Sequence, residues 1–159
     1  MTRKSIAITS LVLLLAGIAQ AGSSINLDAL QCDGYGVVPI KHPRPNDVEI
    51  NGVSGKMVLD TGTGVTVVDQ QFASKTKLGR RSLKLYGGDA AGNVRQSEVG
   101  KVQSFKVGGV PVYRPDVSVT STALGNWNLA GLIGMDLLGQ NRGIIDCGAQ
   151  KLYLVKGVH

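Results

Sequence analysis

The residue of this chain best placed to do chemistry is a single aspartate at the end of an apolar segment. Asp60 follows the apolar residues 57–59. The turn Thr61-Gly62-Thr63-Gly64 comes next and leads into the apolar run 65–68. This order predicts a buried strand that ends by placing one carboxylate where it can react. The chain carries one such turn, so a reaction that needs two carboxylates would take the second from another copy of the chain.

The segments around this turn are short and β-rich, and Gly, Asn or Pro separates them, which predicts an all-β domain. Strands spaced this closely are typical of a small closed barrel or a sandwich. The expected strands are 35–41, 47–51, 56–60, 65–68, 82–86, 94–99, 102–107, 110–113, 116–120, 129–133, 144–146 and 152–155.

Turn and helix signals organise these strands. Residues 52–55 are expected to join the second and third strands, and Gly108-Gly109 is a strong hairpin signal. Asp69 could cap one or two helical turns that run to Lys75. The one convincing helical pattern comes late in the chain, at 135–138.

The first 21 residues have the pattern of a secretory signal peptide. Arg3 and Lys4 give a positive start, residues 6–18 are apolar, and the small residues 19–21 suit a cleavage site. The alternative, a membrane helix, needs about 20 apolar residues. We therefore expect an exported bacterial protein, periplasmic or secreted, without a membrane anchor after cleavage. Residues 22–34 would be an N-terminal extension and 35–159 one domain.

The charge and the cysteines limit the other classes of function. The net charge is +6, or +4 once Arg3 and Lys4 are removed, and the basic residues are dispersed, which disfavours nucleic-acid binding. Cys32 and Cys147 could form a disulfide in an oxidising compartment, worth about 5 kcal/mol at most. Two free thiols, or a bond between subunits, are the alternatives. No metal is expected, because the cysteines and the two isolated histidines show no ligand spacing.

Several motifs occur in a fixed order that resembles the retropepsin-like aspartic proteases, the single-domain, dimeric relatives of pepsin. The resemblance covers residues 37–155. The motifs are Val58-Leu59-Asp60-Thr61-Gly62-Thr63, a Gly-rich hairpin, the run Ala130-Gly131-Leu132-Ile133-Gly134-Met135-Asp136-Leu137-Leu138, and the ending from Ile144-Ile145-Asp146 to Leu154.

The resemblance implies a small closed β-barrel of the retropepsin type with one short late helix. Asp60 would be catalytic, and Thr61 would form a hydrogen bond across the dimer. Gly62 lets the backbone turn sharply and approach its copy at a two-fold axis. A hydroxyl at Thr63 could bond the Asp60 carboxylate, and residues 132–134 would support the catalytic loop.

The hairpin that contains residues 86–93 is the candidate for the flap that this family closes over substrate. An ordinary surface hairpin is the alternative. The candidate flap residues are Tyr86, Gly87, Gly88, Asp89, Ala90, Ala91 and Gly92.

Three other residues of interest receive structural roles. Asp136 opens the late helix and Asp146 ends a strand, and neither is followed by Thr-Gly. Trp127 precedes an apolar run and is expected to be a packing anchor.

The function expected from this sequence is that of an aspartic endopeptidase. A homodimer would activate water between its two Asp60 carboxylates and hydrolyse peptide or protein substrates without a cofactor. A non-catalytic peptide-binding module on the same fold is the first alternative. A small-ligand β-barrel with a fortuitous Asp-Thr-Gly is the second.

Overall fold

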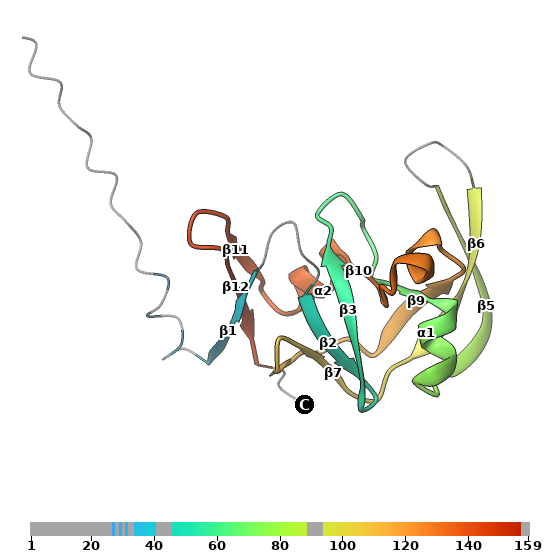
Figure 1. Cartoon of the computed structure of the whole chain (residues 1–159), viewed down its shortest axis with the longest axis horizontal. Helices are drawn as coiled ribbons and strands as arrows, with labels where there is room; N and C mark the ends of the chain where they lie inside the picture. The colour runs from blue at the N-terminus through green and yellow to red at the C-terminus, as the bar shows by residue number, and fades with distance from the viewer. Residues whose placement is uncertain are drawn as a thin grey trace, which may run out of the picture.

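The structure is a computed structural model that describes residues 27, 29 and 31 and the ranges 34–40, 46–88 and 94–156. In these ranges the fold is mostly β, as expected, and the strands form two sheets (Figure 1). The strands are β1 (Tyr35–Pro39), β2 (Asn46–Ile50), β3 (Val53–Leu59), β4 (Val67–Asp69), β5 (Gly79–Gly88), β6 (Val94–Lys101), β7 (Phe105–Val107), β8 (Val110–Pro111), β9 (Asp116–Thr120), β10 (Gly131–Ile133), β11 (Ile144–Asp146) and β12 (Lys151–Val155).

Short helices accompany the sheets, and the expectation of a single late helix is wrong. The late helix is α2 (Met135–Gln140), and α1 (Gln70–Lys75) is a second one. The Asp69 carboxylate accepts a hydrogen bond from the Gln71 N–H at 2.8 Å and so caps α1, as the sequence predicted. A 3-10 helix, η2 (Ala123–Trp127), precedes β10. Within the described residues, no helix is both long and apolar enough to cross a membrane.

The larger sheet has the strand order β5-β6-β9-β4-β10-β3-β2-β7-β8. In its centre β10 runs parallel to β3 and antiparallel to β4. Gly131 fits between these strands with φ at +152°, and a Cβ there would lie 1.9 Å from the Val67 carbonyl oxygen. The parallel pairing of Ile133 with Leu59 places the end of β3, which Asp60 follows, beside the end of β10.

The hairpin of β2 and β3 turns earlier than the sequence analysis expected. Asn51 and Gly52 both have positive φ, 50° and 81°, which is typical of a two-residue type I′ turn. The ladder then continues without a loop, because Ile50 pairs with Val53 and Val48 with Gly55. The predicted turn at 52–55 is therefore wrong, since most of it is strand.

The predicted Gly108-Gly109 hairpin is confirmed. Both glycines have positive φ, and Val107 pairs with Val110 across the turn. Strand β8 ends at Pro111, although the Val112 N–H still donates to the Phe105 carbonyl at 2.9 Å. The flanking strands are shorter than predicted.

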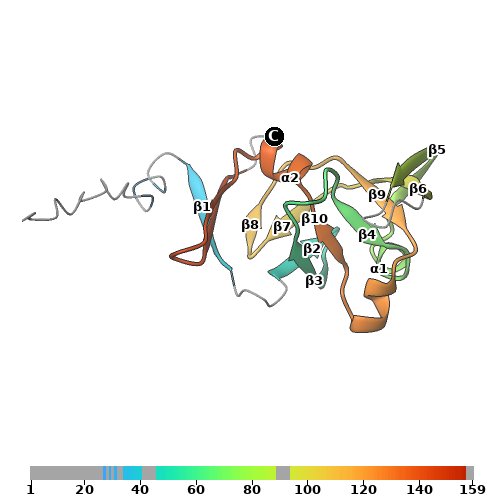
Figure 2. The same cartoon turned by 90° about the horizontal axis from the view of Figure 1, so that it is seen from above.

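The smaller sheet, β1-β12-β11, joins the two ends of the domain (Figure 2). Tyr35 pairs with Val155, and the Lys156 N–H donates to the Gly34 carbonyl at 3.0 Å. Strand β1 packs closely on β8, since a Cβ at Gly36 would lie 2.5 Å from a Val110 methyl. The two sheets therefore share one core, whose fully buried members include Ile50, Met57, Val68, Val107, Ile133, Leu137, Leu152 and Leu154.

Candidate active site

Asp60 lies at the position that the sequence predicted, directly after the last residue of β3. Its N–H donates to the Ile133 carbonyl at 3.0 Å, which extends the pairing of β3 with β10 by one residue. The residue as a whole is half-buried. The backbone of Asp60 is thus fixed by the sheet while its side chain stays within reach of solvent.

The residues that follow hold the Asp60 carboxylate. The Gly62 N–H donates to Oδ1 at 2.9 Å, and the Thr63 hydroxyl donates to Oδ2 at 2.7 Å. The Thr63 N–H also donates to the Asp60 carbonyl at 3.2 Å, which closes the turn. Each oxygen of the Asp60 carboxylate therefore has a hydrogen-bond donor from its own loop, which fixes the orientation of the carboxylate.

The tip of this loop is exposed. Thr61, Gly62 and Gly64 are all exposed, so they are free for contacts beyond the chain. A Cβ at Gly62 would lie 3.2 Å from Asp60 Oδ1, so a larger residue here would crowd the carboxylate. Glycine at this position keeps the approach to Asp60 open.

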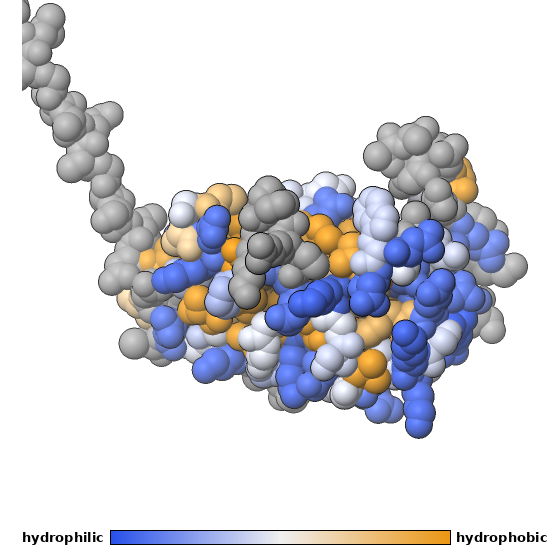
Figure 3. All heavy atoms as spheres, in the orientation of Figure 1, coloured by the Kyte–Doolittle hydropathy of each residue, from blue (hydrophilic) through white to orange (hydrophobic). Residues whose placement is uncertain are grey.

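A mostly apolar cavity of about 380 Å³ lies beside the tip. Thr61 contributes to it from the loop, Met135 and Leu138 from α2, and Ile145 from β11. Met135 is 47% exposed, and Val65, which lies on the loop that follows Asp60, is 48% exposed. Figure 3 shows hydrophobic atoms near the upper edge of the molecule, where β3, β10 and α2 meet. A hydrophobic surface therefore adjoins the carboxylate.

The segment 133–135 lies under the loop. The Met135 N–H donates to the Thr63 carbonyl at 2.9 Å. A Cβ at Gly134 would lie 2.5 Å from the carbonyl carbon and oxygen of Val65, so the two backbones touch. The end of β10 thus packs directly against the loop that carries Asp60.

The remaining acids near the fold's turns are tied into local structure. Asp146 accepts the Ala149 N–H at 2.8 Å in the turn between β11 and β12. Asp69 is buried and accepts from the Thr122 hydroxyl at 2.7 Å as well as from Gln71. Burial would raise the pKa of Asp69, but these hydrogen bonds hold it below its usual value.

Asp136 begins α2, as expected, and also contacts residues that the sequence analysis did not connect with it. Its carboxylate reaches Thr66, 70 positions earlier in the chain. No local pattern signals a contact over such a separation.

Among the described residues, no group of three or more His, Cys, Asp or Glu side chains could hold a metal ion.

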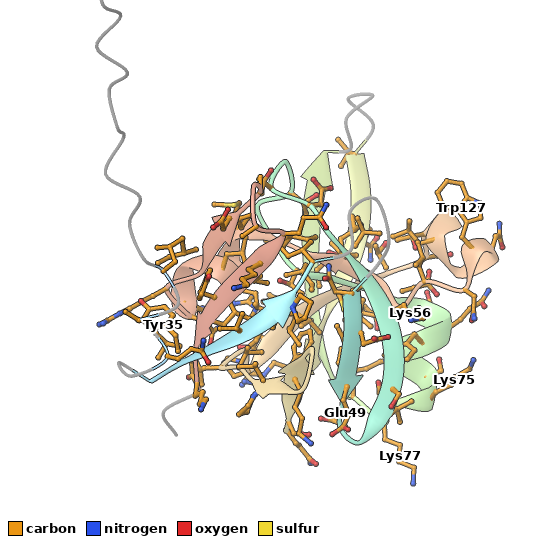
Figure 4. The ribbon with its side chains drawn as sticks, turned by 60° about the vertical axis from the view of Figure 1, so that its left-hand side comes forward. Tyr35, Glu49, Lys56, Lys75, Lys77 and Trp127 are labelled. Atoms are coloured by element: carbon orange, nitrogen blue, oxygen red, sulfur yellow. The ribbon has the colours of Figure 1, made fainter. Side chains whose placement is uncertain are left out.

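The expectation that Trp127 anchors the core is wrong. Its side chain is 73% exposed, and Figure 4 shows the ring projecting outward at the end of η2. The residues at its two ends, and not Trp127, define η2. The Thr122 hydroxyl caps its start by accepting the Leu124 N–H at 3.2 Å, and Asn128 ends it with a backbone in the left-handed region.

Two expectations fall largely outside the described residues. Tyr86, Gly87 and Gly88 belong to β5, which pairs with β6 up to Gly88 and Val94. Asp89, Ala90, Ala91 and Gly92 lie outside the described ranges, as does Cys32. Cys147 is exposed in the turn after β11 and has no disulfide partner within the described residues.

Comparisons with known proteins show which proteins this chain is similar to. The model of the family "gag-polyprotein putative aspartyl protease" matches residues 46–140, more than half of the chain. DNA damage-inducible protein 1 of Chaetomium globosum is 28% identical over 112 residues, which cover 70% of this chain and 24% of that protein. The protein of the same name from Neurospora crassa is 28% identical over 108 residues, 68% of this chain and 24% of its own length. This chain therefore spans about a quarter of these relatives.

Proposed function

The chain belongs to the gag-polyprotein aspartyl protease family, a retropepsin-like family, and from this premise we propose that it is a homodimeric aspartic endopeptidase. One observation carries the proposal. The Asp60 carboxylate lies at an exposed loop at the end of a central strand, with hydrogen bonds from Gly62 and Thr63 to its two oxygens. Each chain supplies one such group, and peptide hydrolysis by this chemistry uses two.

In the proposed dimer the two Asp60 carboxylates face each other and share one proton, because like charges so close cannot both ionise. The ionised carboxylate takes a proton from a bound water as the water attacks the peptide carbonyl carbon. The protonated carboxylate donates a hydrogen bond to the carbonyl oxygen. The C–N bond then breaks, and the amine leaves with the proton that the first carboxylate took from the water. No covalent intermediate with the enzyme forms.

The described residues support distinct parts of this scheme. Gly62 and Thr63 orient the carboxylate through the hydrogen bonds given above. Thr61, exposed at the tip of the loop, is proposed to bond across the dimer. The apolar cavity that it lines with Met135 and Leu138 is proposed to be covered by the second copy. The hairpin of β5 and β6 is proposed to be the flap over a peptide substrate.

Two further features belong to this proposal. The contact of Gly36 with Val110 is where we propose that the two sheets complete a small barrel.

We also propose that residues 1–21 are removed on export to the periplasm or beyond, on the signal-peptide pattern alone. N-terminal sequencing of protein from the cell envelope would test this, and an intact Met1 in exported protein would contradict it.

The test of the function uses a mixed peptide library with the wild type and with Asp60→Asn. We expect the wild type to cut peptides with a bell-shaped pH dependence, because activity needs one protonated and one ionised carboxylate. Asp60→Asn keeps the shape of the side chain and should bind peptides without cutting them. Sedimentation at micromolar protein should show a dimer.

Three results would contradict the proposal. They are full activity in Asp60→Asn, activity that depends on an added metal or a thiol reagent, and a persistent monomer that still cuts peptides. Peptide binding without any cleavage by the wild type would instead favour the non-catalytic module.

A further inference from the structure

A buried polar contact joins the loop after Asp60 to the start of α2. Thr66 is fully buried, and both its N–H and its hydroxyl donate to Asp136 Oδ1, at 2.8 and 2.6 Å. The Thr66 hydroxyl oxygen in turn accepts the Gly134 N–H at 3.2 Å. Every hydrogen-bonding group of this threonine side chain is therefore used.

A third segment completes the contact. The Arg114 guanidinium, from the connection between β8 and β9, lies 2.5 Å from Asp136 Oδ2. The two side chains are only 13% and 16% exposed. A charge this well buried is strongly unfavourable when its partner is removed, so each of the two charges depends on the other. Asp136 thus links three segments that are distant in sequence.

Further hydrogen bonds connect the start of α2 with Asp60, the proposed catalytic residue. Each residue of the strip 133–136 forms a hydrogen bond with the loop 60–66: Ile133 with Asp60, Gly134 with Thr66, Met135 with Thr63, and Asp136 with Thr66. The bonds of Ile133 and Met135 join backbone to backbone. The bonds to Thr66 use the Thr66 hydroxyl and the Asp136 carboxylate, so substitutions can change them without altering the backbone bonds directly.

We propose that Asp136, Thr66 and Arg114 are positioning residues that fix the loop carrying Asp60. This inference rests on the proposed function of Asp60. Asp136 would hold the far end of the loop through Thr66, while Arg114 holds Asp136 in place. Catalysis is sensitive to such support, because a misplacement of about 1 Å can lower a rate about 100-fold.

The competing explanation is that this contact contributes only to stability. The chain offers a matched control at Thr76, which ends α1. Thr76 is 1% exposed, and its hydroxyl donates to the Ala73 carbonyl at 3.0 Å. Thr76→Val therefore removes a buried hydroxyl with one hydrogen bond, whereas Thr66→Val removes a buried hydroxyl with two. The hydrogen bonds of Thr76 join it to α1 and to Asn51, away from the Asp60 loop.

The first experiment compares the kinetics of these variants with a peptide that the wild type cuts. We expect Thr66→Val to lower kcat by about 10- to 100-fold with KM within about two-fold. Thr66→Ser, which restores a hydroxyl, should recover most of the rate. Thr76→Val should lose thermal stability with kcat unchanged. Asp136→Asn keeps an acceptor for Thr66 but removes the charge opposite Arg114, so it provides a second variant if Thr66→Val does not fold.

The second experiment does not need activity. Amide hydrogen exchange, followed by NMR, reports on the N–H groups of Asp60 and Thr63, which donate to Ile133 and to the turn itself. We expect both to exchange about 10-fold faster in Thr66→Val and in Asp136→Asn, but not in Thr76→Val.

These two experiments separate the inference from the function on which it rests. If the wild type cuts no peptide, the proposed function fails, and the exchange rates alone then decide the positioning role. If kcat in Thr66→Val stays within two-fold of the wild type, or if the Asp60 and Thr63 amides exchange no faster than in Thr76→Val, the positioning role is wrong.

Discussion

Gly134 is the position at which one added methyl group should most directly disturb the proposed catalytic loop. It precedes α2 with φ −94° and ψ 176°, a conformation that any residue can adopt. The constraint is therefore steric. A Cβ would lie 2.5 Å from the carbonyl carbon and oxygen of Val65 and 2.9 Å from the Thr66 nitrogen. Ordinary contact begins at 3.4 Å, so in Gly134→Ala the two backbones must separate by about 0.9 Å.

This displacement sets the size of the expected effect. Overpacking of this kind costs about 1–3 kcal/mol. The melting temperature falls by about 4 °C for each kcal/mol in a domain of about 125 residues. Because the loop that moves carries Asp60, we also expect kcat to fall by about 10- to 100-fold. KM should change less, since no group that we place in contact with substrate is removed.

The assay measures thermal unfolding by circular dichroism and peptide cleavage on the same preparations. Gly79→Ala is the matched control, because Gly79 begins β5 at the end far from its turn with β6, and a Cβ there would lie 3.4 Å from the Lys101 Cβ, an ordinary contact. Alanine in place of glycine in a strand should leave the melting temperature unchanged or raise stability by up to about 1 kcal/mol. If Gly134→Ala melts and cuts like the wild type, the packing of residues 133–135 against the loop does not support Asp60 as we argue.

Three other predictions test different parts of the fold. Asp69→Asn should lower the free energy of unfolding at pH 7 by about 1–3 kcal/mol. Folding lowers the pKa of Asp69, so the difference between the wild type and Asp69→Asn should shrink as the pH falls below the ordinary value of 3.8. Urea titrations at several pH values would measure this. Trp127→Ala should change the free energy of unfolding by less than about 0.5 kcal/mol, since the ring is mostly exposed, and a loss above about 2 kcal/mol in thermal unfolding would show that it is packed. Peptide mass spectrometry of non-reduced exported protein should find Cys32 joined to Cys147, and two free thiols would refute that bond.

The parts of the fold that sequence could predict are those encoded within a few residues. The cap at Asp69 is an example, because an aspartate before a short helix satisfies N–H groups only two positions away. The hairpin at Gly108-Gly109 is another, since two consecutive residues with positive φ strongly favour glycine. The end of β3 was predicted at Asp60, one residue beyond its end at Leu59, from the change from apolar residues to Asp-Thr-Gly.

The parts that were missed depend on residues far apart in the chain. Thr66 and Asp136 have no common local pattern, and only the insertion of β10 between β3 and β4 brings them together. Trp127 has a side chain that is usually buried, but whether it finds neighbours depends on where η2 lies in the fold. The turn at Asn51-Gly52 did have a local signal, which the second glycine, Gly55, obscured.

The pairing of β1 with β12 determines how this domain can be inserted into another protein or circularly permuted. Tyr35 of β1 and Val155 of β12 lie opposite each other, so the two ends of the domain are about 5 Å apart. A domain with adjacent ends can be inserted into a host protein at a single surface turn, or circularly permuted by a short linker. In a chain permuted at Gly108-Gly109, β12 and β1 would form a local hairpin in place of the longest-range pairing of the fold. The pairing of β7 with β8 would then join the two new ends, so the cost of closing a loop of nearly the whole domain passes from β1 and β12 to β7 and β8. We therefore expect the permuted chain to keep the fold and to fold at a rate similar to that of the natural order.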